Sequence, residues 1–325
     1  MAKKFGAIFI MLGLLVCRLH GMPVPNLPPE TRNAALRYWL AFAEMQDPPA
    51  DKETSDLLEK TAAGEVPWNE AKLGPILDKN EVAIQIMQRA TKLPDCDWGV
   101  EYGRGAAASI AYAPRARVLA RLNTLYGMRL AAKGDTRGAV DTWLDGVRFS
   151  QDLAKGGTLI FALVAKTALL SNLNALTQAA EKGALSPSDK VKVAAVVRAL
   201  PDTAFDWSQA LALEQSAITS FVKNVQSAGD PAEYYEQWMG HQPLASLSGL
   251  SASGAAAFDQ VMSSAEEAMR QTPSKTAAQL PVLQKSVESL NPVYRELIPS
   301  FPKMNESRTQ VAAARQKLLL LIAPK

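Results

Sequence analysis

Cysteine and histidine are scarce in this sequence, and their scarcity excludes several kinds of chemistry. The 325 residues include two cysteines and two histidines, and Cys17 and His20 both lie near the N-terminus. The rest of the chain therefore has only Cys96 and His241. A single cysteine cannot form an intramolecular disulfide, and a single histidine cannot build a histidine-rich zinc site. We expect no metal and no other cofactor.

Complete motifs for nucleophilic catalysis are also missing. A Ser-His-Asp triad would have to use His241, and the nearby residues 249–253 fail the GxSxG motif at its last position. Ser220 and Lys223 match the SxxK motif of serine acyl-transfer enzymes, but the SDN and KTG motifs that accompany it are absent. No GxxxxGK[ST] loop for nucleotides is present. The sequence therefore predicts a protein that is not an enzyme.

The N-terminal apolar run, residues 5–16, is too short to span a membrane. As a helix it would be about 18 Å long, whereas the hydrocarbon core of a bilayer is roughly 30 Å thick. Lys3 and Lys4 precede this run and Pro23 follows it, which is the pattern of a bacterial export signal. We expect residues 1–21 to be a signal peptide, and the mature protein to be periplasmic or secreted.

The point of cleavage has two interpretations. Gly21 is a small residue that would allow cleavage before Met22. The alternative is lipidation of Cys17, which would make the protein a membrane-anchored lipoprotein, although Val16 is a poor fit for the position before a lipidated cysteine.

Excess charge is absent from the mature chain. The formal net charge of +3 is accounted for by Lys3, Lys4 and Arg18, all within the predicted signal. A neutral mature chain gives no electrostatic reason to expect nucleic acid or an anionic membrane as a partner.

Aromatic residues make up only 7% of the chain, while apolar residues make up 48%, a balance that favours helices packed closely on helices. Apolar residues recur at spacings of three and four, as Val140, Trp143, Leu144 and Val147 do. The longest apolar stretch after the signal contains Lys166, which favours a buried helix over a membrane span. The expected helices cover 31–46, 52–62, 69–92 with a break at Gly74-Pro75, 115–133, 136–154, 158–181, 187–200, a segment of about 25 residues opened by Pro201, 255–271, 274–289 and 305–322.

Short turns such as Gly134-Asp135 join these helices into antiparallel hairpins. Stacked hairpins form an α-solenoid, since each leaves an apolar face for the next to cover. The sequence thus predicts an all-α fold with a helical-repeat region at 22–239. Residues 240–254, which are rich in Ser, Gly and Pro, are expected to be a flexible linker. The C-terminal helices, 255–325, are expected to pack on the solenoid.

One hairpin, residues 120–151, carries a family pattern. It has small residues, an alanine and bulky residues at the required spacing, and these are Gly127, Leu130, Ala139, Trp143 and Gly146. In this respect the segment resembles one tetratricopeptide repeat, which implies a solenoid like that of tetratricopeptide proteins. Asn123 replaces the early tryptophan of that pattern, and Gln151 replaces its closing proline.

More widely, the chain resembles a group of exported, uncharacterised bacterial helical proteins. The resemblance is carried by residues 33–39 (NAALRYW), residues 94–99 (PDCDWG) and Asn291-Pro292. It implies an export signal and a helical-repeat body, and it implies no activity.

The best candidate for a ligand site lies between two predicted helices. Asp95, Asp97 and Glu101 place three carboxylates close to the rings of Trp98 and Tyr102. Carboxylates that bond hydroxyl groups and rings that cover an apolar face are suited to a sugar. The alternative is that the rings fill the seam between hairpins while the acids cap helices. The acids beside Cys96 should raise the pKa of its thiol and so disfavour a thiolate.

Arginines form a second candidate site. Arg115, Arg117 and Arg121 cluster at the start of one predicted helix, with Arg104 upstream. They could bind a phosphate or an acidic segment of a partner, or they could form a solvated face paired with scattered acids.

The leading hypothesis is a non-enzymatic protein that binds a protein or peptide partner in the bacterial cell envelope, since solenoids present extended binding surfaces. The alternative is a protein that binds or cleaves carbohydrate or cell-wall glycan with residues 95–102. Against cleavage, Glu306-Ser307 matches only the first two letters of the lytic transglycosylase motif. A third interpretation is a structural subunit.

Overall fold

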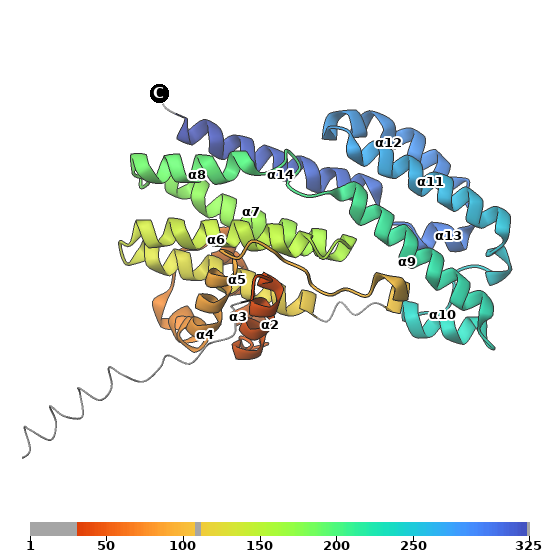
Figure 1. Cartoon of the computed structure of the whole chain (residues 1–325), viewed down its shortest axis with the longest axis horizontal. Helices are drawn as coiled ribbons and strands as arrows, with labels where there is room; N and C mark the ends of the chain where they lie inside the picture. Colours follow the sequence, from red (N-terminus) through yellow and green to blue (C-terminus); the bar gives the residue numbers. More distant parts are fainter. Residues whose placement is uncertain (1–30, 108–111, 324–325) are drawn as a thin grey trace, which may run out of the picture. The chain divides into compact units, whose positions relative to one another are not determined.

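The computed structural model describes residues 31–107 and 112–323, and the predicted signal peptide with Cys17 lies outside the described residues. The fold is all-α (Figure 1), and the only pairing of extended backbone in the described part is an isolated bridge between Asn33 and Asp95. The chain from Asn33 onward forms one compact unit. Its helices are α2 (Ala34–Glu44), α3 (Lys52–Ala63), α4 (Glu70–Ala90), η2 (Tyr102–Ala107), α5 (Tyr112–Ala132), α6 (Thr136–Ala154), α7 (Leu159–Glu181), α8 (Pro187–Ala199), α9 (Trp207–Ser227), α10 (Pro231–Met239), η3 (Leu247–Gly249), α11 (Ala252–Arg270), α12 (Pro273–Glu288), α13 (Pro292–Leu297) and α14 (Phe301–Ile322).

The helices from α2 to α8 contact one another in alternation. Helix α2 packs on α4, α4 on α6 and α6 on α8, while α3 packs on α5 and α7. Consecutive helices α4 to α7 also pack pairwise, and the most extensive contacts are those of α6 with α5 and α7. Helix α6 therefore lies at the centre of this part of the fold.

The C-terminal helices contact the earlier ones through α9 and α14. Helix α9 packs on α7, α11 and η2, and α11 packs on α12. Helix α14 packs on α12 and also on α7 and α8, more than a hundred residues earlier in the chain (Figure 1). The last helix thus covers a face of the first group of helices.

A buried arginine fixes α14 against the turn between α11 and α12. Arg308 is almost fully buried, and its guanidinium donates to the hydroxyl of Thr276 at 2.8 Å and to the carbonyl oxygen of Gln271. The carbonyl lies at the C-terminal end of α11, where the helix dipole favours a cation. Burial lowers the pKa of Arg308 below its usual value.

Small residues let α5, α6 and α7 approach closely. A side chain at Gly127 would overlap the indole of Trp143, and one at Gly146 would overlap the amide of Asn172 on α7. The indole is fixed because its Nε1 donates to the Thr124 carbonyl oxygen at 3.2 Å. Ala139 is also buried at the start of α6, while Leu130 is partly buried against the core.

The predicted break at Gly74-Pro75 is wrong, because α4 runs without interruption from Glu70 to Ala90. Pro75 cannot donate to the carbonyl oxygen of Ala71. Ala71 and Pro75 are both exposed, so solvent can replace the missing hydrogen bond without a break in the helix.

The helix predicted to open at Pro201 begins instead at Trp207. Ala204 has a left-handed φ of 63°, which a helix cannot include. The turn is closed by the Trp207 indole, which donates to the Thr203 carbonyl oxygen at 3.1 Å. Helices α10 and α13 were not predicted, because nine and six residues are too short for a periodic pattern to identify.

The segment predicted to be a flexible linker, 240–254, contains η3 and the start of α11. Leu250 within it is buried, and its carbonyl oxygen accepts a hydrogen bond from the amide of Gln226 on α9. The proposed division of the chain at this segment stays a prediction.

Replacing Gly127 with alanine should lower the free energy of unfolding by roughly 1–3 kcal/mol, since overpacking of a fixed seam outweighs the gain in helix propensity. Urea denaturation followed by circular dichroism would measure it. Gly103→Ala is the matched control, because nothing lies near its added methyl group. We expect the control to change stability by at most about 0.5 kcal/mol. Equal stabilities for the two variants would mean that the seam between α5 and α6 widens freely.

Candidate functional site

The loop that carries the three candidate carboxylates is fixed to the start of α2. The backbone N–H of Ala34 donates to the Asp95 carbonyl oxygen at 2.7 Å. The side chain of Asn33 donates to the Asp97 carbonyl oxygen and accepts from its N–H, both at 2.9 Å. The Asp97 carboxylate in turn accepts from the N–H of Gly99 at 2.9 Å. The loop is therefore tied down mainly by its own backbone.

Trp98 lies in the core rather than beside these acids. Its side chain is only 6% exposed, its ring stacks on Tyr112 at 4.3 Å, and its Nε1 donates to the Asp152 carbonyl oxygen at 2.7 Å. Tyr38 stacks on it at 5.5 Å. The ring is thus no open platform for a sugar, and it fills a seam as the alternative interpretation expected.

The other members of the loop face solvent. Asp95, Asp97 and Glu101 are exposed, and Glu101 forms an ion pair with Arg104 at 3.1 Å. Tyr102 is 38% exposed, and its hydroxyl donates to the Gly156 carbonyl oxygen at 2.7 Å. The acids and the large ring that the sequence placed together are therefore separated by the fold.

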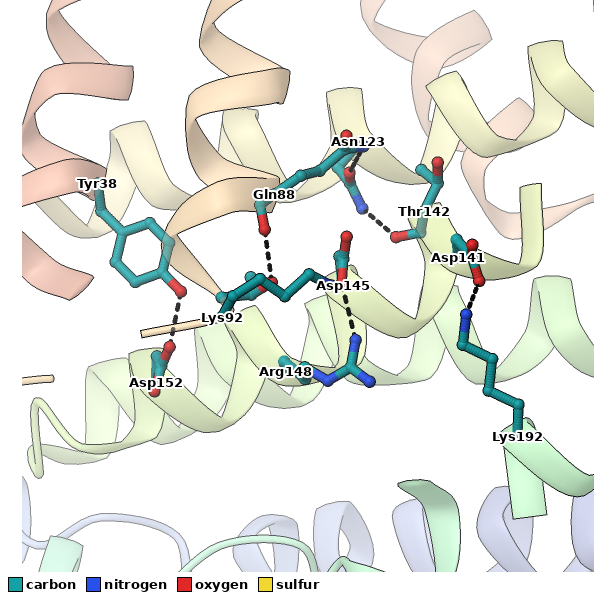
Figure 2. A network of polar contacts seen from close by, with 11 residues as sticks. Tyr38, Gln88, Lys92, Asn123, Asp141, Thr142, Asp145, Arg148, Asp152 and Lys192 are labelled. Carbon is teal, nitrogen blue, oxygen red and sulfur yellow. Dashed lines mark hydrogen bonds and ion pairs between the residues drawn. The ribbon is translucent and has the colours of Figure 1, made fainter. Parts of the chain in front are cut away.

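A polar network on α6, which sequence reasoning missed, holds this loop in place (Figure 2). The Asp152 carboxylate accepts from the Tyr38 hydroxyl at 2.6 Å and from Lys155 at 2.7 Å. Its backbone carbonyl oxygen accepts from Trp98, and the Cys96 thiol lies 3.8 Å from that oxygen. Burial, reinforced by Asp152, raises the pKa of Tyr38 well above its usual value. Tyr38 and Asp152 are buried, whereas Lys155 at the edge of the cluster is half exposed.

Two further acids on α6 fasten neighbouring helices. Asp145 is nearly buried and pairs with Lys92 after α4 and, at 2.8 Å, with Arg148. Asp141 pairs with Lys192 on α8. Figure 2 shows the acids along α6 with Lys92 and Lys192 on other elements and Arg148 on α6 itself. The spacing of these acids in the sequence could have indicated the polar face of α6.

Asn123, which departs from the tetratricopeptide pattern, also belongs to this network (Figure 2). It is fully buried on α5, accepts from Gln88 of α4 at 3.0 Å and donates to the Thr142 carbonyl oxygen of α6 at 2.9 Å. One amide side chain therefore links three helices.

The arginine candidates divide into two groups. Arg115 forms an ion pair with Asp47 at 2.7 Å and donates to the Phe42 carbonyl oxygen at 2.7 Å, so it is engaged within the fold. Arg117 and Arg121, in contrast, make no hydrogen bond and no ion pair with any residue in the described ranges, although the charge of Glu59 acts on Arg121.

These two arginines line a groove formed by α3, α5 and α7, with a cavity volume of about 690 Å3. Ile160, which is 45% exposed, and Val164 supply an apolar wall on α7, and Glu59 of α3 lies at the edge. Arg121 is half-buried, and burial is the largest influence that lowers its pKa, against the opposing effect of Glu59. The groove offers two cations beside an apolar surface.

The other candidates from the sequence are His241, a metal site and the most apolar helix. His241 is exposed, with its Nε2 3.3 Å from Glu296 Oε1. No group of three or more His, Cys, Asp or Glu side chains suited to a metal occurs in the described residues. Helix α7 is long and apolar enough to cross a membrane, but half of its most apolar window is buried within the protein.

Comparison with protein-family models, with curated proteins and with solved structures gives no significant match to the chain. The resemblances to tetratricopeptide repeats and to exported helical proteins therefore stay predictions from the sequence.

Replacing Trp98 with alanine should lower the free energy of unfolding by about 3–5 kcal/mol, the usual loss for a large buried ring. Trp238→Ala on α10 is the control, since that side chain is 43% exposed; its loss should be about 1 kcal/mol or less. Chemical denaturation of both variants would measure these losses in the free energy of unfolding. A fully stable Trp98→Ala variant would restore the ring as a candidate ligand platform.

Burial, with Asp152 as the next influence, raises the pKa of Cys96 to about 12. Only the thiolate is nucleophilic, so at pH 8 iodoacetamide should alkylate the folded mature chain at least about 100-fold more slowly than the chain in urea. Mass spectrometry of timed samples would give both rates. Equal rates would contradict this assignment and point to an activated thiol.

Proposed function

We propose that the protein is an exported, non-enzymatic helical-repeat protein that binds a protein or peptide partner in the bacterial cell envelope. The observation that carries the proposal is the pair of arginines, Arg117 and Arg121, that line the groove between α3, α5 and α7 and form no hydrogen bond or ion pair with the described residues. A peptide with acidic side chains would neutralise them, while its apolar side chains would cover Ile160 and Val164.

The proposed architecture is a solenoid of the tetratricopeptide type over α2–α8. It is supported by the alternating helix contacts and by the close approach at Gly127 and Gly146. In such arrays one row of helices lines an extended binding surface, and here α3, α5 and α7 form that row. The mature protein would be periplasmic or secreted, with a lipid anchor at Cys17 as the alternative.

The second candidate is a protein that binds or cleaves glycan through residues 95–102. The exposed carboxylates of Asp95, Asp97 and Glu101 near Tyr102 favour it. The burial of Trp98 weighs against it, because the larger ring cannot stack on a sugar. We therefore place the peptide-binding proposal first. Full retention of glycan binding and turnover in Asp97→Asn would remove the second candidate.

The charge-reversal variant Arg117→Glu/Arg121→Glu should bind its envelope partner at least about tenfold more weakly, which corresponds to roughly 1.4 kcal/mol or more. The mature chain from Met22 would be immobilised and exposed to envelope extract, with and without protease treatment, and the captured partner then titrated against each variant. Raising the salt concentration should weaken binding by the unsubstituted chain. The difference in affinity between this chain and the charge-reversal variant should then become smaller.

The control Arg137→Glu/Lys223→Glu makes the same change in net charge at exposed positions on α6 and α9. It should bind as the unsubstituted chain does. Unchanged affinity in the groove variant would remove this groove as the binding site. Capture that survives proteolysis of the extract and is lost in Asp97→Asn would favour the glycan candidate.

A further inference from the structure

Helix α3 lies away from its neighbours in the sequence. Helices α2 and α4, which precede and follow it, pack on each other, whereas α3 makes its main contacts with α5 and α7. Only Leu58, Thr61 and Ala62 of its twelve residues are buried. It is therefore attached to the groove by a small surface.

The groove runs along α3 and continues past its end. Beside the first turns of the helix lies the cavity of about 690 Å3 at Arg117 and Ile160, and beside its last turns lies a smaller one of about 170 Å3. Past its end lies a cavity of about 500 Å3 between Met128 of α5 and Gln178 of α7. Residues that line these cavities recur every three or four positions along most of α7, so one face of that helix forms a wall of the whole groove. Helix α3 lies alongside this wall and packs on α5 and α7.

Helix α3 is capped at both ends by its own residues. Asp51 caps its start by accepting from the Thr54 N–H at 2.8 Å, and Gly64 ends it with a left-handed φ of 78°. Pro48-Pro49 precedes the helix and Pro67 follows it, outside the contacts between α2 and α4. It could leave the groove as a unit while those contacts persist.

The fit of α3 in the groove is imperfect. The hydroxyl of Thr61 is fully buried and has no hydrogen-bond partner. An unpaired buried hydroxyl is destabilising, so a ligand with alanine at this place would bind better. Leu58 and Ala62 fill the apolar part, and the charge of Glu59 acts on Arg121.

We infer that α3 is an internal, displaceable occupant of this groove, and that the partner is an acidic amphipathic helix that takes its place. This inference rests on the proposed function and specifies its ligand. The ligand carries leucine and a small residue four positions apart on one face, as Leu58 and Ala62 are, with an acid next to the leucine, as Glu59 is. Such a helix laid in a groove is a recurrent mode of recognition.

The first test uses a fluorescein-labelled peptide of residues 50–65 titrated into the mature chain by fluorescence anisotropy. The peptide should bind a Leu58→Ala chain at least about tenfold more tightly than the unsubstituted chain, since its own α3 then competes less well. Leu320→Ala, which removes an exposed leucine on α14, is the matched control and should behave as the unsubstituted chain. Circular dichroism checks that each chain is folded.

Two altered peptides test the chemistry of the ligand. Thr61→Ala in the peptide should tighten binding, and Glu59→Lys should weaken it several-fold, with a smaller effect in the Arg117→Glu/Arg121→Glu chain. Equal binding of the parent peptide to the Leu58→Ala and unsubstituted chains, or no binding to either, would overturn the inference. A dimer of the Leu58→Ala chain in sedimentation analysis would overturn it too, because the occupant would be a second copy.

Hydrogen exchange of the unsubstituted chain gives a test that needs no variant. Backbone amides of α3 should exchange at least about tenfold faster than those of α5 and α7, because undocking exposes only α3. Equal protection would make α3 a permanent part of the core. That result would leave the charge-reversal test of the open groove unaffected, so failure of this inference and failure of the proposed function are separable.

Discussion

The buried carboxylate of Asp152 is the interaction on which the arrangement of the first helices depends. It accepts from Tyr38 and Lys155, while the backbone carbonyl of the same residue accepts from Trp98. Removal of the partners of a buried charge is strongly destabilising, by about 3–5 kcal/mol in typical cases. Helix α2, the loop before η2 and helix α6 must therefore come together at one place. Trp98 lies in the core for this reason, with its ring between aromatic neighbours and its indole N–H satisfied.

The sequence was sufficient wherever structure is decided locally. Helix α6 begins and ends at the predicted residues, 136 and 154, because Asp135 caps it and its apolar residues repeat every three or four positions. The all-α class was predicted for the same reason and is confirmed. In the α5–α6 hairpin, Gly127 lies against Trp143, since a hairpin with a short turn leaves little choice of register.

The structural features that the sequence did not predict depend on contacts between distant segments. Asp97 and Trp98 are adjacent in the chain, yet one faces solvent and the other is buried, and only the position of α6 decides which. Arg115 and Arg117 look equivalent in the sequence, but the end of α2 accepts hydrogen bonds from Arg115 alone. The sequence likewise did not predict that α3 packs on α5 and α7 rather than on its neighbours in the chain.

The return of α14 to α7 and α8 limits how such a chain can change in evolution. An open solenoid can lengthen by duplication of a hairpin, since each unit contacts only the next. Here a hairpin inserted after α8 would displace α9 and α14 from their contacts with α7. The contacts of the last helix therefore limit insertion of a helical hairpin at that point.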